Sequence, residues 1–159
     1  MFLTPAQANS LYMGSFFPEA KINPPTKDKL EFWIHNTKQA LKIWESVPQK
    51  RVNLDTYHSS DEDCGSLHCV GGWLIRDKYF QDLGFHPEDG VPVFDSGPHY
   101  FSGSDTARIL FGSPEVFSPR GGMLDPEGFE NMLDYDAAKS RLRRHLSNLE
   151  ASLKEISEN

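Results

Sequence analysis

Cysteine is scarce in this chain, and long hydrophobic runs are missing from it. The two cysteines, Cys64 and Cys69, are too few for a disulfide-built secreted scaffold, so we expect reduced thiols. No stretch approaches the roughly 20 apolar residues of a membrane-spanning helix, and the opening MFLTPAQ lacks the basic start and apolar run of a secretory signal. These absences predict a cytoplasmic protein with no membrane partner.

Positive charge is also in short supply. The chain has 16 Lys and Arg against 23 Asp and Glu, a formal net charge of -7. Direct binding to nucleic acid is disfavoured, because it requires Lys and Arg to neutralise phosphates. Neither GxGxxG nor GxxxxGK occurs, so the sequence does not predict a nucleotide-phosphate cradle, and no cofactor is expected.

The charges that are present lie unevenly along the sequence. Residues 54 to 105 are strongly acidic, whereas the last predicted helix carries Lys139, Arg141, Arg143 and Arg144 within six positions. Such an asymmetry can orient a molecule on a charged partner, although most charge runs are solvated faces. The candidate docking residues are therefore the acidic run Asp61, Glu62 and Asp63 and the basic cluster Arg141, Arg143 and Arg144.

Length and composition predict a folded domain. With 38% hydrophobic residues and 12% aromatics, 159 residues are enough to bury a continuous core. We expect a mainly α, single-domain helical bundle of about four to six helices. Residues 1–25 would form an N-terminal helix and a Pro-rich link, and residues 26–159 the core.

Apolar periodicity and capping residues place the helices. Thr26 caps a helix whose apolar stripe runs from Leu30 to Trp44, and a second stripe runs from about Asp134 to Ile156. We expect these two to pack together, with a homodimer through the C-terminal helix as the alternative. Shorter helical segments are predicted at 4–13, 66–83, 104–111 and 113–117, a helix start at Asp125, an extended segment at 53–58, and a long irregular loop or small β-hairpin at 85–103.

The most distinctive stretch is CGSLHCVGGW, residues 64 to 73. Cys64, His68 and Cys69 are weak metal-ligand candidates, since Cys-x4-Cys without a second pair is not the spacing of a zinc knuckle. A thiolate near a helix start is a second possibility. The reading that accounts for most residues is structural: Ser66 caps a helix, and the glycines admit a close neighbour, which we expect to be the Trp33/Trp44 helix. That structural motif comprises Cys64, Gly65, Ser66, Cys69, Gly71, Gly72 and Trp73.

This decamer resembles the Cys-Gly-(Thr or Ser)-x-x-Cys-x-(Ala or Gly)-Gly-Trp signature of small uncharacterised proteins of bacteriophages and some bacteria. Flanking similarities are Val52-Asn53-Leu54-Asp55, Leu110-Phe111 and Ala138-Lys139-Ser140-Arg141-Leu142. The resemblance spans roughly residues 44 to 146 and implies a phage-type origin and a similar fold, but no activity. Gly71, where many relatives carry alanine, favours tight packing at this point.

The sequence thus favours a non-enzymatic, phage-type accessory protein that binds a host protein, in host takeover or evasion of host defence. It would then act in the host cytoplasm. The alternative is a small site-bearing protein, either a Cys/His enzyme that uses a thiol or zinc, or a pocket that sequesters a small nucleotide signal. Aromatic side chains available for stacking on a base are Trp73, Tyr79, Phe94, Tyr100 and Phe101.

Overall fold

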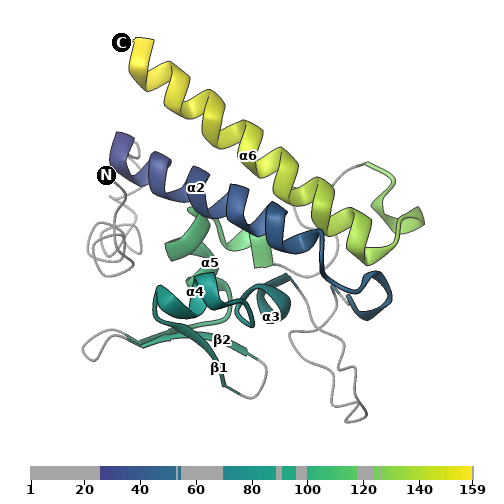
Figure 1. The fold of residues 1–159 in the computed structure, drawn as a ribbon. Coiled ribbons are helices and arrows are strands. Elements are labelled where there is room, and N and C mark those ends of the chain that lie inside the picture. The colour runs from purple at the N-terminus through teal and green to yellow at the C-terminus, as the bar shows by residue number, and fades with distance from the viewer. Residues whose placement is uncertain are drawn as a thin grey trace.

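Two long helices lie side by side above a layer of short helices, and a small sheet lies beneath that layer (Figure 1). The computed structural model describes residues 26–52, 54, 70–88, 91–95, 100–117, 124–125 and 127–158. The long helices are α2 (Lys27–Trp44) and α6 (Asp134–Glu158), and the short ones are α3 (Val70–Leu74), α4 (Lys78–Asp82) and α5 (Ser104–Phe111). Single 3-10 turns are η3 (Gln49–Arg51), η4 (Pro114–Phe117) and η5 (Phe129–Asn131). The prediction of a mainly α fold is confirmed.

Helices α2 and α6 pack along their apolar stripes, as the periodicity predicts. Thr26 caps α2 by accepting the Lys29 amide N–H at 3.2 Å. At the opposite end of α2 the Trp44 indole donates to the Tyr135 carbonyl at 3.1 Å, and the Tyr135 hydroxyl donates to the Trp44 carbonyl at 2.9 Å. Their rings stack with centroids 5.6 Å apart. The reciprocal bonds satisfy groups that burial would otherwise leave without partners.

Helix α5 ends beneath this pair, and side chains from both long helices cap it. The last carbonyls of a helix have no partner within it. Here three side chains bond to the last carbonyls of α5. The Trp33 indole donates to the Ile109 carbonyl at 3.1 Å, and the Asn36 amide donates to the Leu110 carbonyl at 2.8 Å. The His145 imidazole bonds to the Phe111 carbonyl at 2.6 Å. Burial lowers the pKa of His145, an effect that its bond to the carbonyl opposes. Three consecutive carbonyls thus fix α5 to α2 and α6.

The region predicted as a loop or hairpin is a three-stranded antiparallel sheet in the order β1-β2-β3. Its strands are β1 (Phe85–Glu88), β2 (Val91–Asp95) and β3 (Tyr100–Ser102). Phe85 and Phe94 are paired in register and buried, with ring centroids 5.0 Å apart. The small hairpin is therefore present, and a third strand extends it.

The prediction of one helix over residues 66–83 is wrong in its described part. Helix α3 ends at Leu74, and α4 begins only at Lys78. The break has a local cause, because the Asp77 carboxylate accepts the Tyr79 amide N–H at 2.9 Å and so caps a new helix. The predicted helix at 4–13, most of the extended segment at 53–58 and motif residues 64–69 lie outside the described residues.

Candidate functional site

The described end of the motif is a close-packed turn of helix. A Cβ built on Gly71 would lie 2.9 Å from Cδ2 of the Phe117 ring, closer than real side-chain contacts allow. Phe117 belongs to η4 and is itself buried. The prediction that the glycines admit a close neighbour is thus confirmed for Gly71, but the neighbour named was wrong: it is the Phe117 ring and not the Trp33/Trp44 helix.

Trp73, the last residue of the motif, links α3 to the segment after α2. Its indole N–H donates to the Arg51 carbonyl at 2.9 Å. The guanidinium carbon of Arg76 lies 5.0 Å from the centroid of the Trp73 ring, a distance typical of a cation–π contact. Trp73 is partly buried, whereas Arg76 is exposed. An aromatic ring therefore supports a cation at the surface.

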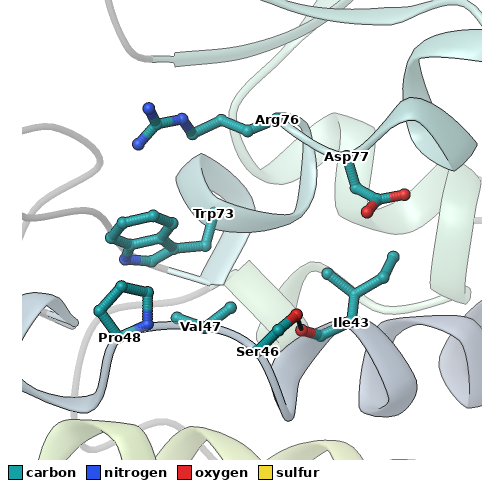
Figure 2. Close-up of a pocket in the computed structure, with 7 residues that line it drawn as sticks. All are labelled: Ile43, Ser46, Val47, Pro48, Trp73, Arg76 and Asp77. Atoms are coloured by element: carbon teal, nitrogen blue, oxygen red, sulfur yellow. Dashed lines mark hydrogen bonds between the residues drawn. The ribbon is translucent and has the colours of Figure 1, made fainter.

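Beside Trp73 lies an open hollow of about 160 Å³ (Figure 2). One wall comes from the end of α2 and the turn after it, and the other from α3 and the turn that leads to α4. The Trp73 indole is drawn between Pro48 and Arg76. The Ser46 hydroxyl donates to the Ile43 carbonyl at 2.9 Å, and Asp77 is engaged as a helix cap. The lining residues are Ile43, Ser46, Val47, Pro48, Trp73, Arg76 and Asp77.

The hollow does not match the nucleotide pocket considered from the sequence. Small-molecule sites usually enclose about 300 to 1,000 Å³. Of the aromatic residues considered for base stacking, only Trp73 lines this hollow. Tyr79 is half-buried and donates to the Asn36 amide oxygen at 2.7 Å, and burial raises its pKa to about 12. Phe94 is in the core, Tyr100 is 56% exposed on β3, and the Phe101 side chain lies outside the description.

The basic cluster on α6 divides between the core and the surface. Arg143 and Arg144 are exposed, as the docking hypothesis requires. Arg141 is fully buried, so its inclusion in a docking surface was wrong. Its Nε and Nη2 donate to the two carboxylate oxygens of Asp125 at 2.7 and 2.9 Å, and its Nη1 donates to the Val116 carbonyl at 3.2 Å. Arg141 therefore fixes α6 to the segments before it.

The remaining candidates of the sequence analysis lie where the structure gives no description. These are the acidic run Asp61 to Asp63 and the Cys64, His68 and Cys69 set. Within the described ranges no group of three or more His, Cys, Asp or Glu side chains is placed to hold a metal ion. The metal and thiol hypotheses for residues 64–69 stay untested predictions.

Sequence reasoning missed Arg76 and the wall formed by Val47 and Pro48. Arg76 follows Trp73 by three residues in the sequence, a spacing that a helical turn brings together. In the structure Arg76 lies in the turn after α3, where its amide N–H donates to the Trp73 carbonyl at 3.3 Å. The opposite wall is distant in sequence and had no such signal.

Comparison with protein-family models, with curated proteins and with solved structures finds no match to this chain. Among the described helices, none is both long enough and apolar enough to cross a membrane.

Proposed function

We propose that this chain is a non-enzymatic, phage-type accessory protein that binds a host protein, in host takeover or evasion of host defence, in the host cytoplasm. The observation that carries the proposal is the exposed pair Arg143 and Arg144 on α6. No carboxylate of the described residues forms an ion pair with either. In a chain with a net charge of -7, two adjacent arginines without such partners favour an acidic surface on another molecule.

The setting of these arginines supports a docking role. Helix α6 has 25 residues, and its apolar stripe packs against α2, so its arginine-bearing face points to solvent. A helix fixed in this way loses little conformational freedom when it binds. The same packing buries Leu142 and Leu149 of the stripe that a homodimer through α6 would need and partly covers the rest of it, which favours a different partner.

The test is affinity capture from host lysate with the tagged full chain. We expect one dominant partner, and we expect Arg143→Glu with Arg144→Glu to abolish its capture. The matched control is Lys27→Glu with Lys38→Glu, which makes the same charge change at two exposed positions of α2. Equal capture by both double variants would refute a role for the α6 arginines, and the absence of any dominant partner would count against the proposed function itself.

The site-bearing alternative has its own test. Metal analysis and thiol titration of the purified chain would reveal a bound ion or a thiol of lowered pKa at Cys64 or Cys69. Loss of a catalytic turnover on replacement of either cysteine by serine, with the fold intact, would favour the enzyme over the binding protein.

A further inference from the structure

We propose that the hollow beside Trp73 is a second docking site, which takes a protein segment with an apolar side chain next to a carboxylate. It lies on different elements from Arg143 and Arg144 and goes beyond the function proposed for α6. The carrying observation is the combination of an open hollow of partly apolar lining with an exposed arginine supported on its aromatic wall.

The size and lining of the hollow select a single apolar side chain. An enclosed cavity of about 150 Å³ accepts one benzene-sized group. This hollow is open and measures about 160 Å³, which leaves room for one side chain of that size. Ile43, Val47, Pro48 and Trp73 supply apolar surface. A tryptophan that is part of such a wall is the type of residue that contributes most to protein interfaces, where it contacts an anchor side chain of the partner.

Arg76 specifies the charge of the group that lies next to the apolar side chain in the docking segment. Its guanidinium is exposed and stacked on Trp73, and no carboxylate of the described residues forms an ion pair with it. A guanidinium binds a carboxylate through two parallel N–H donors, and a stacked guanidinium loses less freedom when it does so.

The sequence around both walls is basic in an otherwise acidic chain. Exposed cations near the lining residues in sequence are Lys42, Lys50 and Arg51, against Glu45 and Asp77. Asp77 is already engaged as the cap of α4. This local balance favours an acidic segment.

The three tryptophans of the chain provide a site-specific readout. The indole N–H groups of Trp33 and Trp44 donate to carbonyls inside the core, whereas that of Trp73 donates to the carbonyl of the exposed Arg51 and its ring lines the hollow. In ¹H–¹⁵N NMR spectra of the full chain, the acetylated and amidated tripeptide Glu-Leu-Glu should shift the Trp73 indole signal saturably, with a dissociation constant in the millimolar range. The Trp33 and Trp44 signals should not move.

Two control peptides separate the two parts of the proposal. Gln-Leu-Gln removes the carboxylates, and Glu-Ala-Glu removes most of the apolar side chain, so each should bind several-fold more weakly. Adenosine monophosphate tests a nucleotide as the alternative ligand. Equal binding of Gln-Leu-Gln, tighter binding of the nucleotide, or no shift of the Trp73 signal would each overturn the proposal.

A pair of variants separates this site from the face of α6. Arg76→Gln changes an exposed side chain and should weaken Glu-Leu-Glu binding by about three- to fivefold, the effect of one exposed charge pair. Arg144→Glu should leave the binding unchanged. If Arg144→Glu abolished capture of the lysate partner while peptide binding persisted, the two sites would be independent. Loss of peptide binding in Arg144→Glu alone would refute the assignment to the hollow.

Discussion

Two glycines of nearly identical backbone conformation allow the packing around Trp33 to be measured. Gly112 has φ +81° and Gly128 has φ +82°, both in the left-handed region that side chains rarely adopt. A Cβ on Gly112 would lie 2.6 Å from Cδ2 and Cε3 of Trp33, whereas a Cβ on Gly128 would meet no atom within 4 Å. Alanine therefore adds backbone strain at both positions and a steric clash at only one.

The expected free energies follow from this difference. An alanine in left-handed conformation costs about 1 to 2 kcal/mol, so Gly128→Ala should lower the free energy of unfolding by about that amount. Gly112→Ala should cost a further 1 to 3 kcal/mol, roughly, for overpacking. The Trp33 ring cannot easily move aside, because it is 5% exposed and its indole bonds to the carbonyl of Ile109.

Urea unfolding followed by far-ultraviolet circular dichroism measures both variants against the unmodified chain. The midpoints should fall in the order unmodified, Gly128→Ala, Gly112→Ala, with similar m-values if both variants unfold from the native fold. A double variant tests the cause. Trp33→Leu should lower the free energy of unfolding by less in the Gly112→Ala variant than in the unmodified chain, because in the variant it also removes the clash. If the two alanine variants had the same free energy of unfolding within about 0.5 kcal/mol, the close contact with Trp33 would be refuted.

Two further predictions concern the buried polar side chains of α6. Arg141→Met should cost about 3 to 5 kcal/mol because it leaves the Asp125 carboxylate buried without its guanidinium partner, and adding Asp125→Leu should recover part of that loss in urea unfolding. His145 has its pKa lowered by burial, so below about pH 6.5 the unfolded chain binds a proton that the folded chain resists. Stability should therefore be full above that pH and decline as the pH falls, by at most about 1.4 kcal/mol per unit, and His145→Gln should flatten this decline; an unchanged slope would contradict the assignment.

The long elements could be predicted because each combines a cap with a sustained apolar period. Thr26 and the stripe from Leu30 to Trp44 gave α2, and the aliphatic stripe after Asp134 gave α6. Helix α5 was predicted at its observed bounds, since Gly112 follows it in the left-handed conformation of a helix end. In each case the decisive interactions are local in sequence.

Elements that depend on a single cap or on pairing with a distant segment, rather than on a repeating apolar pattern, were predicted less well. The break between α3 and α4 depends on one cap, Asp77, within a segment whose apolar residues continue the helical spacing. The third strand of the sheet depends on pairing between Asp95 and Tyr100 and their neighbours. In the candidate site, Trp73 was singled out from the motif, but the wall opposite it comes from residues 43 to 48, and no local pattern predicts that approach.

The burial of Arg141 follows from its position in the helical period of α6, which decides which cations face the core and which face solvent. Four cations occur between residues 139 and 144, and charge alone treats them as one surface cluster. On a helix, however, Arg141 lies three residues after Ala138 and four before His145, and both of these are buried. The period therefore assigns Arg141 to the inner face, where a guanidinium requires a buried carboxylate, and Asp125 supplies it. Only the cations outside that stripe can meet a partner, so of the three arginines first proposed for docking Arg143 and Arg144 remain.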